Sequence, residues 1–543
     1  MKLKKIVTSI LLLGVCTTTL FGCGSKGGGQ ATTDNVTTEG EKVFNISALK
    51  GGNLDTKFDH LWVNRGDLYK VLTFRSLFLA DNTLTSVEPD LASGYEISDD
   101  GLTYTITMKD GLKWSDGEPL TAEDVEFSIS TLLKAAMANG IYTSAFSKIE
   151  GADAWKDGTA DKLSGITVDG NTIKIKTTQK VGNMINVLAQ FAIYPKHCLE
   201  NVDPLQIHND VFWENPVTNG MYKVGEFNAG NYIVLERNEY YEGEKPKIDK
   251  VVVNIVADHI TAAQSGQTDY LNTNSTGDVT QLDSLSNFTA YPVDTLFYRY
   301  FIVNYKDKDG NVNEKLADPR VREALLYAID RESLAKSLYP NLAEVNNAGV
   351  PKNYEGYNSE VTNYEYNPEK AKELLKEANF DFSQTLKIRY YYSDQTSIDF
   401  VNAVAQYLSD VGIKVDALKF QGDATTEIYT IKDHDIVLKG LSAFGFEEFY
   451  GEYTSSNANF VNLYGTESKF DELYDKLAAE SDQAKREEIL KELQALEQEE
   501  LLKLPMFTLK NVIYINTDKV DVKGELGNPW YAYDLNFEEW DIK

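Results

Sequence analysis

Residues 99–133 read DDGLTYTITMKDGLKWSDGEPLTAEDVEFSISTLL, and this stretch decides the fold. Apolar side chains at every second position from 102 to 108 alternate with threonines, a period that predicts a strand with one buried and one wet face. Asp110-Gly111 then supplies the residue pair of a tight turn. Thr121, with Asp124 three residues later, has the spacing of a capping box and predicts that a helix begins there.

Length and charge bound the class of protein. A chain of 543 residues is too long for one hydrophobic core and predicts two or three domains. The hydrophobic content of 42% is ample for packed interiors. The formal net charge of −30 predicts a surface that repels phosphate backbones and anionic headgroups, so we expect no nucleic-acid partner.

The N-terminus reads as an export signal. Lysines within residues 1–5 precede an apolar run at 6–15 that is too short to cross a bilayer comfortably. Leu20-Phe21-Gly22-Cys23 follows and resembles a bacterial lipobox, which predicts a signal peptide over 1–22 and a lipid on Cys23. An ordinary cleaved signal is the alternative. Residues 23–42, rich in Gly, Ser and Thr, predict a flexible tether.

The second half of the chain alternates strand and helix patterns. Asp318 followed by Pro319 predicts a capped helix start. Residues 386–392, 398–411 and 413–420 read as strand, helix and strand, which predicts a βαβ unit in an α/β lobe. Residues 470–504 read as one long helix, charged on one face and apolar on the other.

Five motifs in the sequence resemble those of one known family. DG-x-TYT-x-T-x-x-DG-x-KWSDGEPLTAEDV-x-FS in residues 100–128 is similar to the signature of the family 5 extracellular solute-binding proteins, the oligopeptide receptors of bacterial ABC importers. Strand-forming words at 219–224, 232–238 and 245–251 have the family's spacing. DPRVREALLYAIDRESL at 318–334 is close to the family's most recognisable helix.

The resemblance implies an α/β fold of the periplasmic-binding-protein type: a two-lobe clamp of type II, cluster C, with an extra small domain. A ligand would be held between the two lobes. The implied domains are a discontinuous domain I, a small domain II and a domain III. Domain I covers residues 43–72, 193–298 and 505–543. Domain II covers residues 73–192, and domain III covers residues 299–504.

The resemblance also implies where a ligand binds. Peptide-binding members carry Gly-Trp-x-Ala-Asp near domain III, where the Asp pairs with the α-ammonium of the peptide. The corresponding word here is Gly440-Leu441-Ser442-Ala443-Phe444, which lacks the acid. Glu447 and Glu448 are the acids that could compensate, and Tyr142 lies where the family places an aromatic side chain near the ligand.

No residue pattern indicates catalysis. The five histidines include no pair at helical ligand spacing, and nucleophile-elbow, Walker and H-E-x-x-H words are absent from the sequence. We therefore expect no enzyme, no cofactor and no metal site, and we expect Cys198 to be a small buried residue. An exported hydrolase and a surface adhesin or sensor are the alternative classes.

The expected partners follow from the resemblance. They are a peptide or another small solute such as an oligosaccharide, the permease and ATPase subunits of an ABC importer, and the membrane through the N-terminal lipid. The receptor is expected to act as a monomer at the outward face of the cell membrane, facing either the periplasm or the exterior.

Overall fold

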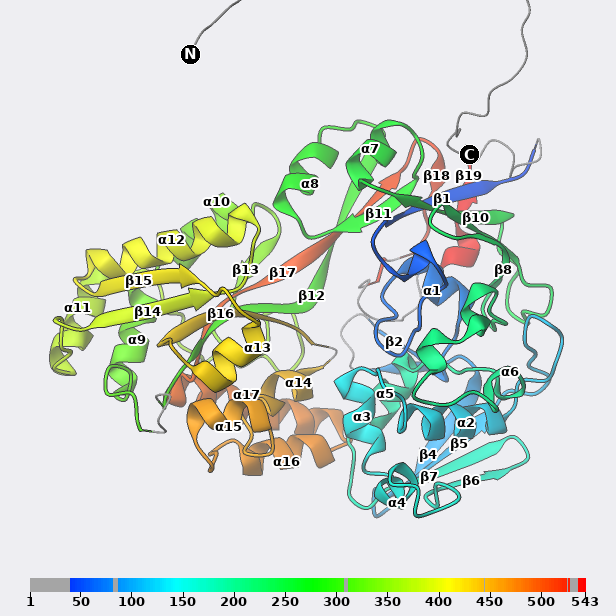
Figure 1. The fold of residues 1–543 in the computed structure, drawn as a ribbon, viewed down its shortest axis with the longest axis horizontal. Coiled ribbons are helices and arrows are strands. Elements are labelled where there is room, and N and C mark those ends of the chain that lie inside the picture. The colour runs from blue at the N-terminus through cyan, green and yellow to red at the C-terminus, as the bar shows by residue number, and fades with distance from the viewer. Residues whose placement is uncertain (1–39, 82–85, 307–310, 444, 525, 528–535) are drawn as a thin grey trace, which may run out of the picture. The chain divides into compact units, whose positions relative to one another are not determined.

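A computed structural model describes residues 40–81, 86–306, 311–443, 445–524, 526–527 and 536–543. Its largest element is an eleven-stranded mixed sheet in the order β15-β14-β16-β12-β17-β11-β1-β10-β9-β8, with β13 paired to β17 (Figure 1). The strands are β1 (Val43–Leu49), β8 (Tyr222–Asn228), β9 (Tyr232–Arg237), β10 (Lys250–Val256), β11 (Tyr270–Thr273), β12 (Phe288–Val303), β13 (Ala343–Val345), β14 (Thr385–Tyr390), β15 (Lys414–Lys419), β16 (Ile436–Ser442) and β17 (Lys503–Asn516).

Two long strands hold this sheet together. β12 and β17 pair antiparallel from Phe288 opposite Asn516 to Ile302 opposite Lys503, and the register shifts between Val293 and Phe297. Twelve of the fourteen residues of β17 are buried, so both faces of this strand are covered. We call the strands β1 and β8–β11 the first lobe and β13–β16 the second lobe. β12 and β17 run through both.

A separate four-stranded antiparallel sheet contains the stretch quoted first. Its order is β4-β5-β7-β6, and its strands are β4 (Ala92–Ile97), β5 (Thr103–Met108), β6 (Ile166–Asp169) and β7 (Thr172–Lys176). β5 confirms the predicted strand and its alternating burial. Helix α2 (Ala122–Leu132) confirms the predicted capping box, because the Thr121 N–H donates to Asp124 at 2.8 Å and the Thr121 side chain accepts from the first turn. Short pairs β2–β3 (Phe78–Ala80, Val87–Pro89) and β18–β19 (Val520–Asp521, Asp541–Ile542) complete the strands.

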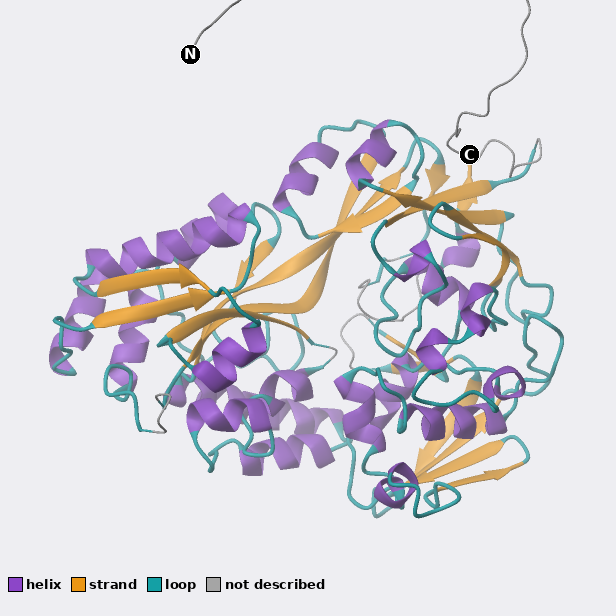
Figure 2. Cartoon of the chain, in the orientation of Figure 1, coloured by secondary structure: helices purple, strands orange, loops and turns teal. Residues whose placement is uncertain are grey.

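Helices lie on both sides of the second-lobe strands (Figure 2). One side has α9 (Pro319–Ala328), α10 (Arg331–Leu338), α11 (Pro368–Glu377) and α12 (Gln395–Asp410), and the other has α13 (Ala424–Thr426), α14 (Phe446–Gly451), α15 (Ala458–Tyr464), α16 (Asp471–Ala479) and α17 (Gln483–Glu500). The remaining helices are α1 (Leu68–Thr73), α3 (Gly140–Phe146), α4 (Ala152–Lys156), α5 (Met184–Gln190), α6 (Lys196–Leu199), α7 (His259–Gln264) and α8 (Thr276–Leu282). Within the described residues, no helix is both long and apolar enough to cross a bilayer.

One sequence prediction about helices is confirmed and one is wrong. Asp318 caps α9 by accepting from the Arg320 N–H, with Pro319 at the first helical position. The single helix expected over 470–504 is two helices, because the Asp482 side chain accepts from the Lys485 N–H and starts α17 as a new helix. Its expected end is also wrong: Lys503 and Leu504 belong to β17, since that strand takes them into the buried sheet.

A buried charge network joins β17 to the helices beneath the second lobe. Glu452 accepts from Lys439 at 2.7 Å, from Lys503 at 3.0 Å and from the Tyr300 hydroxyl at 2.6 Å. Against the opposing effect of burial, the two ammonium charges lower the pKa of Glu452 to about 2. Burial lowers the pKa of Lys503 to about 8. The carboxylate therefore compensates two cations at once.

We expect Glu452→Gln to lower the free energy of unfolding by about 3–5 kcal/mol, because it leaves two buried ammonium groups without their counter-charge. Urea unfolding monitored by circular dichroism measures this loss. The control is Glu488→Gln, which removes an exposed partner 2.7 Å from Lys491 and should cost less than about 1 kcal/mol. Equal losses for the two variants would contradict a structural role for the network.

Candidate functional site

The directions of the parallel strands define where a ligand can bind. In the first lobe β1 is parallel to β10 and β11, and in the second lobe β14 is parallel to β15 and β16. β11 is antiparallel to β17, and β16 is antiparallel to β12. Because β12 and β17 run in opposite directions, the two parallel groups point toward each other along this pair (Figure 1).

The carboxyl ends of both groups therefore meet near the register shift in β12. Thr273, the last residue of β11, lies opposite Val512. Ser442, the last residue of β16, lies opposite Phe297, which pairs with Leu509, three positions from Val512 on β17. Ligands of open α/β sheets bind outside the carboxyl ends of the strands. This region between the two lobes is the candidate site.

The first-lobe side of this region contains a hollow of about 270 Å³ at the end of β1. Its polar lining includes the Ser47 hydroxyl, which lies 2.8 Å from His259 Nδ1, and Asp67, which pairs with Lys70 at 2.7 Å. Burial lowers the pKa of His259, so the neutral imidazole is favoured. The hollow can accept a small polar group.

The second-lobe side contains the motif at 440–444 that the sequence analysis predicts to bind the ligand. Gly440 has no room for a side chain, because an added Cβ would lie 2.7 Å from the Tyr392 hydroxyl and 3.3 Å from the Phe297 ring. The Tyr391 hydroxyl lies 3.4 Å from the Gly440 nitrogen and 3.0 Å from the Tyr392 hydroxyl. The rings of Tyr391 and Tyr392 are stacked with centroids 4.4 Å apart. Aromatic side chains thus cover the strand at Gly440.

The other described residues of the 440–444 motif differ in exposure. Leu441 is half-buried, Ser442 is exposed, and Ala443 is buried with its N–H donating to the Leu296 carbonyl at 3.0 Å. Phe444 lies outside the described residues.

Among the described residues, one edge of β16 has no paired strand over residues 438–442, and the Tyr391 hydroxyl accepts from the Gly440 N–H there at 3.4 Å. β12 pairs with β16 along its whole length. On the opposite edge β14 reaches only Ile436 and Val437. In the part of the chain that the structure describes, no strand pairs with that edge beyond Val437.

The predicted acids are in different surroundings. Glu447, at the start of α14, forms a buried ion pair with Arg486, which also donates to the Leu477 and Glu480 carbonyls at 3.0 Å each. Its carboxylate therefore joins α14 to α17. Glu448 is half-buried, and its charge adds to the effect of burial in raising the pKa of Tyr142.

Tyr142 is a core residue. It is 3% exposed, and its hydroxyl donates to the Gln190 carbonyl at 3.0 Å. The structure thus brings Tyr142 and Glu448 into one neighbourhood. A second group consists of Gly440, Tyr391 and Tyr392. Cys23, the predicted lipidation site, lies outside the described residues.

The sequence analysis missed Arg299 and its aromatic neighbours. Arg299 pairs across the sheet with Gly440, and its guanidinium lies 3.9 Å from the centroid of the Tyr392 ring. A usable signal was present, since Arg299 is the single charged residue in the apolar run LFYRYFIV at 296–303. No resemblance in the quoted words pointed to it.

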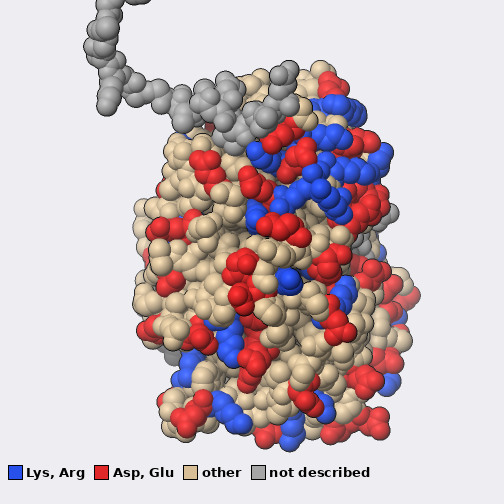
Figure 3. Space-filling view, turned by 90° about the vertical axis from the view of Figure 1, so that its right-hand side faces the viewer, with Lys and Arg blue, Asp and Glu red and all other residues tan. Residues whose placement is uncertain are grey.

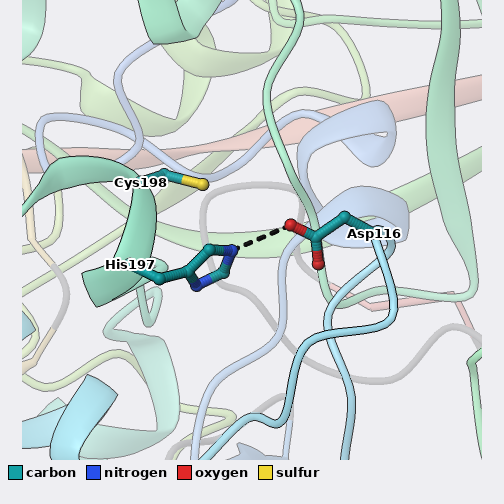
Figure 4. Close-up of side chains that lie close together, drawn as sticks. All are labelled: Asp116, His197 and Cys198. Carbon is teal, nitrogen blue, oxygen red and sulfur yellow. Dashed lines mark hydrogen bonds and ion pairs between the residues drawn. The ribbon is translucent and has the colours of Figure 1, made fainter.

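A cluster outside this region contains metal-ligand residue types. Asp116, His197 and Cys198 have ligand atoms within 4.8 Å of one another (Figure 4). His197 Nε2 and Asp116 Oδ2 are 2.8 Å apart, a hydrogen-bond distance. Two ligands of a tetrahedral zinc ion would be separated by roughly 3.3 Å. Burial raises the pKa of the Cys198 thiol to about 11, which disfavours the thiolate. The geometry fits a pair that joins the 115–117 turn to α6.

The family is now decided by comparison. A family model described as Bacterial extracellular solute-binding proteins, family 5 Middle, matches residues 86–460. The chain belongs to this family. Family 5 proteins bind solutes, and the two lobes described above form its α/β clamp.

Relatives and solved structures agree with this family. A Brucella ovis protein named for ABC transporter peptide binding is 29% identical over 377 residues, which is 67% of this chain and 66% of its own length. The oligopeptide-binding protein AppA of Bacillus subtilis is 28% identical over 461 residues, 77% of this chain and 80% of its own. The substrate-binding protein CtaP of Listeria monocytogenes has the same fold, with a TM-score of 0.73, 24% identity, and coverage of 92% and 99%.

Acidic and basic side chains are interspersed on the face drawn in Figure 3. Basic side chains gather toward its upper part, where acidic ones border them. On this face, acidic and basic side chains are therefore mixed rather than gathered into one field of a single sign.

We expect Gly440→Ala to lower the free energy of unfolding by about 1–3 kcal/mol, because the new methyl group displaces the Tyr392 hydroxyl. Adding Tyr392→Phe removes that hydroxyl and should restore part of the loss. Urea unfolding measures both variants. Gly94→Ala in β4, where an added Cβ meets nothing within 4 Å, is the control. If Gly440→Ala is as stable as the wild type, the close approach at Gly440 is wrong.

Proposed function

We propose that this chain is the extracellular receptor of a bacterial ABC importer, which captures an oligopeptide between its two lobes and delivers it to a membrane permease. The observation that carries the proposal is the edge of β16 at residues 438–442, which has no paired strand among the described residues and lies beside the carboxyl ends of both parallel groups. An extended peptide can add there as a strand, with its main chain bonded and its side chains in separate pockets. The name of the Bacillus subtilis relative, an oligopeptide-binding protein, supports peptide as the ligand.

The ligand-contacting residues in this proposal are those of the sequence analysis. They are Tyr142, Gly440, Leu441, Ser442, Ala443, Phe444, Glu447 and Glu448. The ion pair of Glu447 with Arg486 favours a structural role for that acid. Of the two acids, Glu448 is therefore the better candidate for a contact with the ligand.

Binding without turnover is part of the proposal, since family 5 proteins are described as solute-binding. The receptor acts as a monomer with the permease and ATPase subunits of its importer. The proposed domains are I (43–72, 193–298, 505–543), II (73–192) and III (299–504). The four-stranded sheet lies wholly within 73–192, which supports a separate domain II.

Cys23→Ala tests the proposed lipid anchor. The short apolar run before Leu20-Phe21-Gly22-Cys23 is typical of a lipoprotein signal. We expect wild-type protein in the membrane fraction to incorporate radiolabelled palmitate, and the variant to incorporate none. Cys198→Ala is the control, and it should be labelled like the wild type. A wild-type chain without label would contradict the anchor.

Acetylation of the ligand tests the missing acid at position 444. Peptides carried by the purified full-length protein are eluted, identified by mass spectrometry and synthesised with free and acetylated N-termini. We expect acetylation to weaken binding by less than tenfold, about 1.4 kcal/mol, because Phe444 offers no partner for a buried ammonium. Isothermal titration measures both forms.

A hundredfold loss on acetylation would mean that another acid binds the ammonium. Glu448→Gln would then remove the dependence, whereas Glu447→Gln would lower stability through Arg486. Elution of cleaved peptides would instead favour an exported hydrolase.

A further inference from the structure

Arg299 is buried without an acidic partner. Arg299 is 9% exposed, and its Nε and Nη1 atoms are buried without any hydrogen bond. Among the described residues, no carboxylate forms an ion pair with Arg299. A buried charge in this state is unfavourable unless a partner compensates it.

The other buried arginines show how this chain usually treats such a group. Arg331 donates to the Asn346 carbonyl at 2.7 Å and to the Tyr364 carbonyl at 2.9 Å. Arg65, Arg75, Arg322 and Arg389 also donate to carboxylates or main-chain carbonyls. Among the buried arginines of the described chain, Arg299 is the one with two unbonded nitrogens, whereas Arg65 and Arg331 each leave only Nε unbonded.

Acids close to Arg299 in the fold have other partners. Asp294, five residues earlier on β12, forms an ion pair with Lys510 at 3.0 Å. Asp394 caps α12 by accepting from the Ser397 N–H at 2.8 Å. The aromatic rings of Tyr392 and Phe297, 3.9 and 5.2 Å from the guanidinium, hold it in place. Cation–π contacts of this kind do not satisfy its N–H groups.

The position of Arg299 is at the candidate site. It lies opposite Gly440 on the neighbouring strand, with both residues on the same face of the sheet. α12 begins just after β14 at this edge, and the Asp394 carboxylate already caps its N-terminus. The unbonded Nε and Nη1 of Arg299 are therefore the groups at this edge that favour an anion.

We propose that Arg299 binds a carboxylate of the captured solute. A guanidinium presents two parallel N–H groups that match the two oxygens of a carboxylate. In a peptide this group is either the C-terminal carboxylate or an acidic side chain. The inference rests on the proposed transport function, and it specifies the chemistry of the ligand at the second-lobe wall.

The test uses full-length protein purified in detergent. Casein hydrolysate is passed over the immobilised protein, and the retained peptides are sequenced and synthesised as free acids, as C-terminal amides, and with acidic side chains replaced by amides. Titrations compare wild type, Arg299→Gln and Arg299→Lys. Arg320→Gln removes an exposed cation beside Asp318 and is the matched control.

We expect Arg299→Gln to weaken the free acid by at least tenfold. The peptide form that lacks the relevant carboxylate should bind weakly to the wild type and lose nothing further in the variant. The C-terminal amide and the side-chain amide identify which carboxylate is bound. Arg299→Lys should fall between wild type and Gln, and Arg320→Gln should bind like the wild type.

Thermal unfolding of the ligand-free protein separates binding from a structural role. Because Arg299 forms no ion pair among the described residues, Arg299→Gln should leave the melting temperature unchanged or raise it. A lower melting temperature together with an equal loss for all peptide forms would overturn the proposal. Equal binding of free acid and both amides by the wild type would overturn it as well.

Succinate and succinamide test carboxylate binding by Arg299 separately from the proposed peptide-receptor function. If no peptide is retained, the peptide receptor fails. A rise in melting temperature with succinate, absent with succinamide and absent in Arg299→Gln, would still support Arg299 as a carboxylate site. Succinate without effect on the wild type, in a protein that retains no peptide, would overturn both.

Discussion

The antiparallel pairing of β12 with β17 is the constraint on which the rest of the structure depends. These two strands are the shared centre of one sheet, and every other strand of that sheet takes its direction from them. β11 and β16 both pair antiparallel, one to β17 and the other to β12. Their opposed directions turn the carboxyl ends of both lobes toward one region, and ligands of open α/β sheets bind at such ends.

The register shift between Val293 and Phe297 makes this strand pair a place where the angle between the lobes can change. A bulge interrupts the ladder of hydrogen bonds and increases local bending. Only β12 and β17 connect the lobes within the sheet, so a change of angle at the bulge disturbs few main-chain hydrogen bonds. A clamp that closes on a ligand needs such a place, and the ligand can drive closure only through contacts that differ between its states.

Local rules of sequence predicted much of this fold, and they failed where distant segments meet. The strand at 102–108, the Thr121–Asp124 capping box and the Asp318 cap depend on neighbours within a few residues, and all three are confirmed. The helix expected over 470–504 is wrong because its last residues are drawn into β17, a tertiary effect. The Tyr391–Tyr392 cover over Gly440 required knowledge of strand register. The predicted binding residues themselves stay a proposal.

Two observations bear on the charge that the second lobe presents to a ligand near Gly440. The resemblance to the family places Phe444 where an acid is expected, and the structure shows Arg299 buried opposite Gly440 without an ion pair among the described residues. In our proposal the Arg299 guanidinium faces the ligand, so this part of the second lobe prefers a negatively charged group of the solute. The solute would then be oriented by its negative end at this part of the lobe, even though the protein carries a net charge of −30. Burial makes this possible, because a local cation in a low dielectric outweighs distant surface charges that salt screens.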